Sequence, residues 1–224
     1  MCGRARCTLR PEQVTWACCA GGPDSRPLAT VDLNKYRPSY NVSPGTYLPV
    51  VAYRKEKKKA EAGEEDEGKD GERCPVLHCM KWGLVPSFTK KSDKPGHYRM
   101  FNARSESIAE KASFRQLLPK NRCLVAVEGF YEWKKDGSKK QPYYIHFQDE
   151  RPLVFAALYD SWENAEGTWP FIFNLFEWQV TCRNGTVLAV YFLLGRTRVK
   201  LQCEEEPLAG QQEVLLGAEL LPVT

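Results

Sequence analysis

A series of short apolar runs separated by turn signals is the feature that most limits what this chain can fold into. The runs are rich in Val, Ile, Tyr, Phe and Trp, the residue types that favour strands. They cover residues 47–53, 75–84, 122–133, 141–147 and 153–162, with a turn dipeptide at Asp136-Gly137. Because helical patterns are few and short, this spacing predicts an α+β fold. It should be mainly antiparallel β, a barrel or sandwich with short flanking helices.

The helical signals are confined to three short stretches outside these runs. Residues 11–20 begin with proline, which is favoured in the first turn of a helix. Ser105 can cap a helix that runs to about Lys111, and Ser113 can cap a second one over residues 114–118. We expect these helices to lie outside the sheet.

A charged segment, residues 54–73, separates two of the predicted strands. It contains 7 basic and 8 acidic residues and no aromatic residue. Such a composition cannot bury enough apolar surface to become ordered. The segment is therefore predicted to be a disordered loop between two strands of one domain.

The rest of the chain is basic, although the net charge is only +4. Outside residues 54–73 and 170–224 there are 21 basic and 14 acidic residues, an excess that favours a polyanionic partner. No apolar run is long enough to span a membrane, so no membrane partner is expected. Nine cysteines without an export signal indicate reduced thiols in the cytosol or nucleus. Three scattered histidines do not complete a zinc site, and no metal or other cofactor is expected.

The first residues, Met1-Cys2-Gly3-Arg4, carry unusual chemistry. Because Cys is small, we expect Met1 to be removed, which leaves Cys2 with an α-amine and a thiol on adjacent carbons. Both groups are nucleophiles that are partly deprotonated near neutral pH. The amine can condense with an aldehyde, after which the thiol closes a five-membered thiazolidine ring. Gly3 allows a partner to approach closely, and Arg4 supplies a charge suited to phosphate.

Four stretches, taken in order, resemble one family. They are Met1-Cys2-Gly3-Arg4, Tyr40-Asn41-Val42-Ser43-Pro44, Trp82-Gly83-Leu84-Val85-Pro86-Ser87 with Asn102-Ala103-Arg104-Ser105-Glu106, and Glu128-Gly129-Phe130-Tyr131-Glu132-Trp133. Together they are similar to the SRAP family, the SOS-response-associated peptidases that act as abasic-site processing proteins. The resemblance covers residues 1–169, which it implies to be one compact domain interrupted by residues 54–73.

The resemblance implies a role in the response to DNA damage. It implies a basic cleft for single-stranded DNA and a covalent thiazolidine crosslink between an abasic site and the N-terminal cysteine, here Cys2, which protects the site. It also implies autoproteolytic peptidase activity and a lyase activity. The expected partners are single-stranded DNA with abasic sites and junctions with duplex DNA. The expected state is a monomer in the nucleus, with the cytoplasm as a second compartment.

Three catalytic candidates follow from matching residues to the family motifs. Cys2 provides both bond-forming groups, and Glu132, framed by aromatic residues, is placed to move protons. Asn102 offers amide donors and an acceptor that can orient the sugar or the reacting nitrogen. Taken alone, Glu132 can also be a strand-edge carboxylate paired with a lysine, and Asn102 a turn residue. Glu128, on the same face as Glu132, is a weaker candidate.

The DNA-binding candidates come from the same motifs. Arg4 and Arg104 are suited to bind phosphate, although Arg104 can instead pair with Glu106. Trp82, Leu84 and Pro86 can wedge against the last base pair of a duplex or stack on a base, although Trp82 can instead be a core residue, where most tryptophans lie. Asn41 and Pro44 can line the cleft or merely shape a turn. The full set is Arg4, Asn41, Pro44, Trp82, Gly83, Leu84, Pro86 and Arg104.

The C-terminal part departs from the family pattern. The family carries an active-site His followed by Arg-Met-Pro, and no such motif occurs in this sequence. Residues 170–224 are predicted to be a divergent tail, with a hairpin at Asn184-Gly185 and an irregular remainder. Two alternatives therefore stay open. One is an amidotransferase-like hydrolase in which the amine of Cys2 is the general base, and the other is a DNA-binding module with impaired chemistry.

Overall fold

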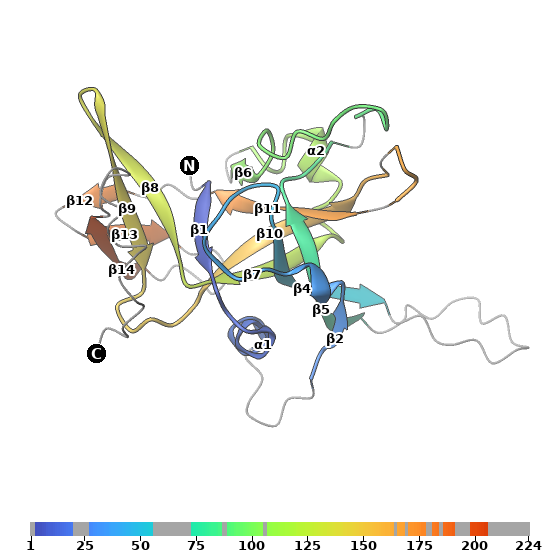
Figure 1. The fold of residues 1–224 in the computed structure, drawn as a ribbon, viewed down its shortest axis with the longest axis horizontal. Coiled ribbons are helices and arrows are strands. Elements are labelled where there is room, and N and C mark those ends of the chain that lie inside the picture. The colour runs from blue at the N-terminus through green and yellow to red at the C-terminus, as the bar shows by residue number, and fades with distance from the viewer. Residues whose placement is uncertain are drawn as a thin grey trace, which may run out of the picture.

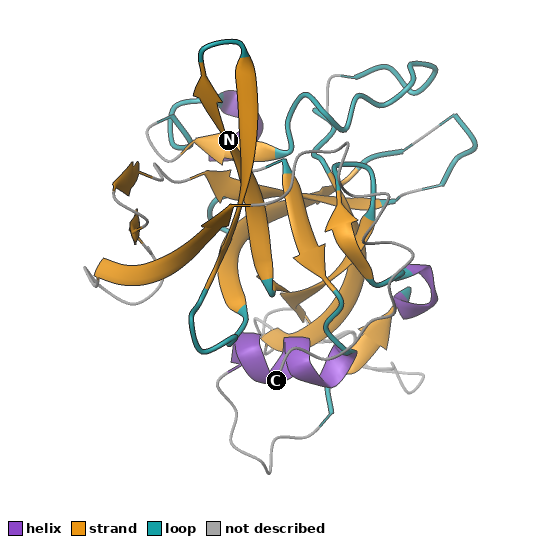
Figure 2. Ribbon diagram, turned by 60° about the vertical axis from the view of Figure 1, so that its left-hand side comes forward, coloured by secondary structure: helices purple, strands orange, loops and turns teal. Residues whose placement is uncertain are grey.

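The computed structural model describes residues 3–19, 27–55, 73–86, 89–104, 107–163, 165–168, 170–177, 181–183, 186–190 and 198–205. Within these residues the chain forms two seven-stranded sheets with short helices packed against them (Figures 1 and 2). No helix among them is long and apolar enough to cross a membrane. The α+β, mainly antiparallel architecture predicted from the short apolar runs is confirmed.

The order of elements along the chain is dominated by strands. The strands are β1 (Arg4–Cys7), β2 (Ala29–Val31), β3 (Ser39–Val42), β4 (Tyr47–Lys55), β5 (Arg73–Trp82), β6 (Asn102–Arg104), β7 (Arg122–Val127), β8 (Gly129–Asp136), β9 (Lys139–His146), β10 (Leu153–Ser161), β11 (Phe171–Glu177), β12 (Thr181–Arg183), β13 (Thr186–Val190) and β14 (Arg198–Glu205). The helices are α1 (Pro11–Cys19), α2 (Ala112–Arg115) and a short 3-10 helix, η1 (Leu33–Lys35).

The strands are divided between two sheets. Sheet A has the order β12-β13-β14-β9-β8-β1-β3, and sheet B has the order β2-β5-β4-β7-β10-β11-β6. An additional pairing of β5 with β11 closes β5-β4-β7-β10-β11 into a barrel-like ring. The β2–β5, β5–β11 and β6–β11 pairs are parallel, and the others are antiparallel.

The apolar run over residues 122–133, predicted as one strand, is two strands in two sheets. β7 pairs with β4 and β10 in sheet B, whereas β8 pairs with β1 and β9 in sheet A. The chain turns between them at Glu128, whose backbone N–H donates to Arg6 O at 3.1 Å. Gly129 allows this corner, because a Cβ there would lie 2.5 Å from the Tyr144 ring. A continuous apolar pattern carries no sign of a change of sheet, so the sequence could not reveal it.

The core fills the space between the sheets and also covers the outer face of sheet B. The inter-sheet cluster includes Trp82, Phe130 and Phe173. On the outer face of sheet B, α1 packs over a second cluster around Val14 (Figure 1). The α2 region covers a third cluster around Phe114. Sheet B is therefore covered on both faces.

Two predictions concern segments beside these strands. β4 and β5 pair as far as Lys55 and Arg73, so the charged segment joins the two strands of one hairpin. The predicted disorder is wrong for Arg54, Lys55 and Arg73, which lie in these paired strands. It stays a prediction for residues 56–72, which lie outside the described part of the chain. The helix predicted over residues 105–111 is wrong for its described part, since residues 107–110 form turns. A stretch this short, without a continuous apolar face, does not sustain a helix.

The segment after residue 169 is joined to both sheets. β11 pairs with β10, β5 and β6 inside sheet B. β12 and β13 pair antiparallel on the two sides of Asn184-Gly185, the arrangement that a hairpin there requires. The remainder was predicted to be irregular, whereas β14 pairs with β9 in sheet A. Its sequence, RVKLQCEE, alternates polar and apolar residues in its first part, so a period-2 signal was present.

Candidate active site at the amino terminus

The described chain begins at Gly3, and Cys2 lies outside the described residues. Gly3 packs against the ring of Phe101, because a Cβ at this position would come within 3.4 Å of Phe101 Cε2. Consecutive Cα atoms are about 3.8 Å apart, so a contact made by Gly3 is one residue from the reactive position. The contact with Phe101 therefore marks where the N-terminal residue is attached to the fold.

Phe101 is held by the core of sheet B. Its carbonyl oxygen accepts hydrogen bonds from Trp82 Nε1 at 3.0 Å and from Leu175 N at 3.0 Å. The Trp82 and Phe101 rings pack edge to face with centroids 6.0 Å apart, a favoured aromatic geometry. Phe101 thus links the buried core to the start of the chain. Sequence reasoning missed this residue, and its position directly before Asn102 was the available signal.

β6 places two candidates on one face. Asn102 lies opposite Leu175 in the β6–β11 pair, and Leu175 belongs to the inter-sheet cluster. Ala103 belongs to the cluster on the α2 side, so strand alternation puts Asn102 and Arg104 on the inter-sheet face. Asn102 is partly buried and Arg104 is exposed.

Glu132 approaches the same region from sheet A. Phe130, two residues before it, is buried in the inter-sheet cluster. Alternation along β8 therefore turns Glu132 to the inter-sheet side, where it is partly buried. Its neighbour Tyr131 is the register partner of Arg4. Asn102 and Glu132 thus come from facing sheets, near the point where the chain begins.

Arg4 and Asn41, both predicted to bind DNA, are in contact. Arg4 Nη1 donates a hydrogen bond to Asn41 Oδ1 at 3.2 Å, and both residues are exposed. Pro44 is buried in the turn after β3, where Gly45 N donates to Trp82 O at 2.7 Å. Arg4 and Asn41 are therefore accessible to a ligand, whereas Pro44 shapes a turn, the alternative role that the sequence left open.

The Trp82–Pro86 segment supports the site from within. Trp82 has 0% of its surface exposed and Leu84 has 2%, so the prediction that they wedge or stack against DNA is wrong, and both are core residues. Gly83 has φ +115°, and a Cβ there would lie 2.3 Å from His97 O. The packing therefore requires glycine at this position. Pro86 is only partly buried, and its predicted DNA contact stays a prediction.

Glu128, the weaker alternative to Glu132, has a structural role. Its carboxylate accepts hydrogen bonds from Thr8 N at 2.8 Å and from the Thr8 hydroxyl, and Arg6 Nε lies 3.5 Å from it. These contacts tie the end of β1 to the corner between β7 and β8. Glu128 thus lies at the corner before β8, whereas Glu132 lies within β8.

Three cysteines in the core are poor competitors for the chemistry of Cys2. Burial raises the pKa of the Cys7 thiol to about 11, and the Glu128 carboxylate adds to this shift. Burial also raises the pKa of Cys79 to about 12 and raises that of Cys123 well above its ordinary value. These thiols stay protonated at neutral pH and are therefore weak nucleophiles.

The three histidines occupy structural positions. His78 is buried in β5, and this burial together with the charge of Arg54 lowers its pKa to about 4. His97 Nδ1 lies 2.8 Å from Gly83 O, and burial lowers the pKa of His97. His146 stacks on an aromatic ring of β9 with centroids 4.8 Å apart. Each histidine is thus explained by its local packing.

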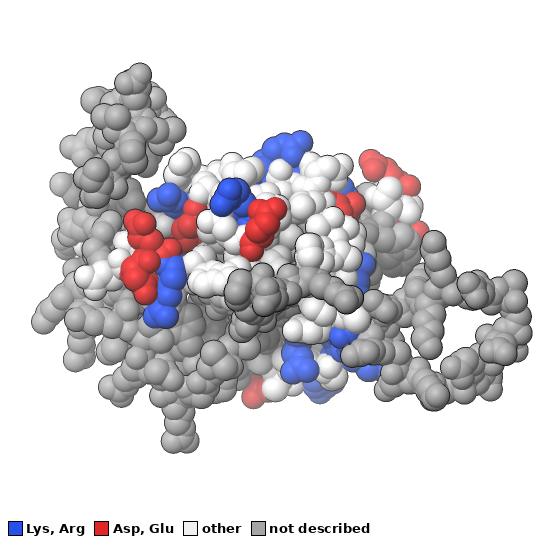
Figure 3. Space-filling view, turned by 90° about the horizontal axis from the view of Figure 1, so that it is seen from below, with Lys and Arg blue, Asp and Glu red and all other residues white. Residues whose placement is uncertain are grey.

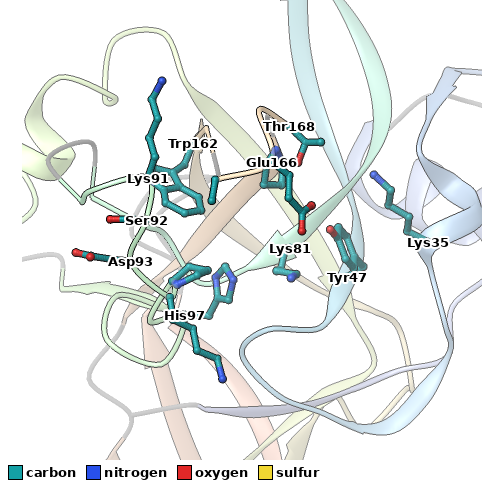
Figure 4. A pocket seen from close by; sticks show the side chains of 14 residues that line it. Lys35, Tyr47, Lys81, Lys91, Ser92, Asp93, His97, Trp162, Glu166 and Thr168 are labelled. Atoms are coloured by element: carbon teal, nitrogen blue, oxygen red, sulfur yellow. The ribbon is translucent and has the colours of Figure 1, made fainter.

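A pocket of about 700 Å³ lies between β4, β5, the loop after β5 and the β10–β11 loop (Figure 4). The charged residues that line it, histidine aside, are Lys35, Lys81, Lys91, Lys94, Asp93 and Glu166. Lys35 pairs with Asp32 at 2.8 Å, and Lys91 pairs with Glu163. The lining therefore carries four basic and two acidic side chains, and two of its lysines are already paired with carboxylates.

Charge on the α1 side of the molecule is also mixed, with basic and acidic side chains interspersed (Figure 3). Within the described ranges, no group of three or more His, Cys, Asp or Glu side chains is placed to hold a metal ion. Near the start of the chain, the cations are supplied by β1 and β6 through Arg4, Arg6 and Arg104.

Comparisons with known proteins point to a single family. The sequence model of the SOS response associated peptidase (SRAP) family matches residues 1–185, past the boundary at 169 inferred from the motifs. The chain is 38% identical over 191 residues to "Abasic site processing protein HMCES" of Xenopus tropicalis, covering 75% of this chain and 54% of that protein. It is 34% identical over 134 residues to "Abasic site processing protein YobE" of Bacillus subtilis, covering 59% of this chain and 52% of that protein. The chain thus spans about half the length of these curated relatives.

Solved structures share the fold. A protein from Bordetella bronchiseptica matches with a TM-score of 0.60 at 17% identity, over 92% of this chain and 100% of that one. A phage-related protein from the same organism matches with a TM-score of 0.51 at 26% identity, over 78% of this chain and 68% of that one. The family model matches residues 1–185, and this range includes the motifs at the chain start, on β6 and on β8. The chain belongs to the SOS response associated peptidase (SRAP) family.

Proposed function

We propose that this chain senses abasic sites in single-stranded DNA and links to them covalently through Cys2. The relatives named above are abasic site processing proteins. The observation that carries the proposal is the position of Gly3. It packs against Phe101, between the strand that begins with Asn102 and the strand that carries Glu132.

The reaction follows from the two groups on Cys2. A ring-opened abasic sugar presents an aldehyde, to which the free α-amine adds, and loss of one water gives an imine. The thiol then adds across the carbon–nitrogen double bond. Sulfur bonds to carbon and the thiol proton passes to nitrogen, which closes a thiazolidine ring. Water is the one product released, and no oxidant, reductant or cofactor is consumed.

Glu132 and Asn102 have separate roles in this proposal. The amine must lose a proton before it attacks, and the hydroxyl that leaves as water must gain one, so one carboxylate can serve both steps. The amide of Asn102 suits it to orient the sugar or the reacting nitrogen. Because the family His motif is absent from this sequence, Glu132 acts without that partner. We expect the reaction to be slower by about 10²–10⁴-fold than in a relative with the His, but not abolished.

The proposed partner is single-stranded DNA with abasic sites, including junctions with duplex DNA. Arg4 and Arg104 are exposed cations suited to phosphate. In this proposal the protein acts as a monomer in the nucleus, with the cytoplasm as a second compartment, and the crosslink protects the abasic site. Removal of Met1 by its own peptidase activity and a lyase step on abasic DNA are further activities of the same site.

An oligonucleotide with one abasic site tests the proposal. Protein without Met1 should form an adduct that survives heating, and Cys2→Ala should abolish it. Cys2→Ser keeps the amine and removes the thiol, so its stable adduct should require a reductant that traps the imine. Undiminished adduct from Cys2→Ala without a reductant would contradict the assignment.

The impaired DNA-binding module is the alternative raised by the missing His motif. It predicts that the natural chain binds single-stranded DNA and yields no Cys2-dependent adduct. Measuring binding and adduct formation on the same preparation distinguishes the two. Adduct without measurable binding to intact DNA would point instead to a small aldehyde as the substrate.

A further inference from the structure

On the outer face of sheet A, exposed aromatic rings lie beside cations. Phe130 of β8 is buried between the sheets, so alternation turns its neighbours Tyr131 and Trp133 to the outer face. Trp133 has 43% of its surface exposed. Aromatic rings and basic side chains that share a sheet surface are suited to single-stranded nucleic acid, because unpaired bases stack on the rings.

β1 and β3 add the cations and a third ring. Arg4 and Arg6 alternate with the buried residues of β1, and the β1–β3 register shifts as at a bulge, which re-aims side chains. Tyr40 of β3, 52% exposed, lies under Arg6, whose guanidinium carbon is 4.8 Å from the ring centroid. Tyr131 Oη donates to Tyr40 O at 2.9 Å, so β8 and β3 are tied together across β1.

We propose that this set, the outer strip of Arg4, Arg6, Tyr40, Tyr131 and Trp133, is a stacking platform for the bases that flank an abasic nucleotide in single-stranded DNA. The proposal rests on the function proposed above. An abasic nucleotide has no base of its own to stack, so its neighbours must supply this part of the binding energy. The outer strip begins beside Gly3, where the reactive residue is attached, and extends away from it along β8.

The β8–β9 hairpin continues the outer strip away from the body of the molecule (Figures 1 and 2). Trp133 lies opposite Pro142 in this hairpin. Beyond it, residues 134–140 read KKDGSKK, with four lysines and one aspartate. At about 3.3 Å per residue, roughly 13 Å separate Tyr131 from Lys135, enough to follow a few nucleotides. By its sequence alone this tip carries three more positive than negative charges, which suits a polyanion.

The contacts within this surface give Arg6 and the aromatic rings different roles. Glu128 lies 3.5 Å from Arg6 Nε and shares its guanidinium. The charge of Arg6 is therefore partly balanced, and its main effect is to hold the Tyr40 ring. Stacking is expected from the rings and contact with phosphate from the exposed Arg4, and the lysine-rich sequence of the hairpin tip adds positive charge.

The test is affinity for intact single-stranded DNA, which has no aldehyde and so separates binding from crosslinking. Trp133→Leu and Tyr40→Leu should each weaken binding by roughly 5- to 150-fold, the value of one stacked base. Trp133→Phe should retain most of the affinity. Trp16→Leu is the matched control, because Trp16 is 64% exposed on α1, which packs on sheet B, and its replacement should leave affinity unchanged.

Two further measurements identify the kind of contact. Duplex DNA hides its bases, so Trp133→Leu should weaken duplex binding far less than single-strand binding. Replacing the four lysines of the tip by glutamine should lower the salt dependence of binding. The slope of log Kd against log salt should fall by about 0.7 for each lysine that contacts a phosphate.

The outcomes separate this proposal from the function on which it rests. Unchanged single-strand affinity in Trp133→Leu and Tyr40→Leu overturns the stacking platform, and so does an equal loss for duplex DNA, which would indicate phosphate contacts alone. Failure of the proposed function looks different, because the natural protein would then form no Cys2-dependent adduct whatever its affinity for intact DNA. Thermal unfolding of each variant, with Trp133→Phe as the conservative case, shows that a loss of affinity is not a loss of fold.

Discussion

The two sheets share one core but differ in what covers their outer faces. On sheet B, α1 and the α2 region cover clusters around Val14 and Phe114. On sheet A, Tyr40 and Trp133 remain exposed beside Arg4. The difference teaches that similar aromatic residues have different tasks in the two sheets. Those of sheet B hold the site in place, and those on the outer face of sheet A are available to a ligand.

Trp82→Ala should have the largest effect, because it removes a fully buried ring from the inter-sheet core. We expect the free energy of unfolding to fall by about 3–5 kcal/mol. The change also removes the hydrogen bond to Phe101 O, so the adduct rate should fall as well. Urea denaturation and a time course of adduct formation measure both effects. Trp16→Ala, at an exposed position of α1, should change stability by less than about 0.5 kcal/mol, and similar losses in the two variants would erase the comparison.

His78, which is buried in β5 of sheet B, should make the stability of the protein depend on pH. Its pKa in the folded protein is about 4, lowered by burial from the ordinary value of 6.5. Between these two pH values the unfolded chain binds a proton that the folded chain excludes, so stability should fall as the pH decreases from about 6.5 to about 4. A shift of this size corresponds to about 3 kcal/mol. Urea denaturation at pH 7 and at pH 4.5 should show most of this loss.

His78→Leu is the control for that pH dependence. Leucine has no proton to bind, so the variant should lose less stability than the natural chain over the same pH interval. Asp32 Oδ2 lies 3.8 Å from His78 Nε2 and opposes the shift, and Asp32→Asn should therefore make the loss steeper. Identical pH profiles for all three proteins would show that His78 does not titrate as a buried group.

The sequence predicts strands and motif residues better than it predicts contacts between residues that are distant in the chain. Apolar runs located most strands, and the motifs singled out Asn102 and Glu132, which the fold brings near the chain start. The strand that carries Asn102 was not predicted. The sequence left two roles open for Trp82 and gave no sign of the positive φ of Gly83, because burial and this backbone angle arise from contacts with Phe101 and with the loop at residue 97. Such contacts join residues distant in the chain, and a local pattern looks the same with or without them.

Two glutamates four residues apart offer a comparison within sheet A. Glu128→Ala removes the acceptor for Thr8 and the partner of Arg6, so the free energy of unfolding should fall by about 1–3 kcal/mol. Glu132→Gln should leave stability nearly unchanged and slow adduct formation by about 10²–10⁴-fold. Denaturation curves and adduct time courses on both variants separate the two roles. A catalytic loss in Glu128→Ala larger than that in Glu132→Gln would reverse the assignment.

Trp133→Leu should have only a small effect on stability, although it replaces the same residue type as Trp82→Ala. Its ring is 43% exposed on the outer face of sheet A, and leucine retains apolar contact with the sheet, so the free energy of unfolding should change by about 0.5 kcal/mol. The same variant should lose affinity for intact single-stranded DNA, whereas Trp82→Ala should lose stability first. Urea denaturation measures the loss of stability for each tryptophan variant, and a binding titration measures its loss of affinity for single-stranded DNA. A loss of stability in Trp133→Leu close to that of Trp82→Ala would mean that the outer face of sheet A is packed against another part of the protein, and the contrast between an open and a covered sheet would then fail.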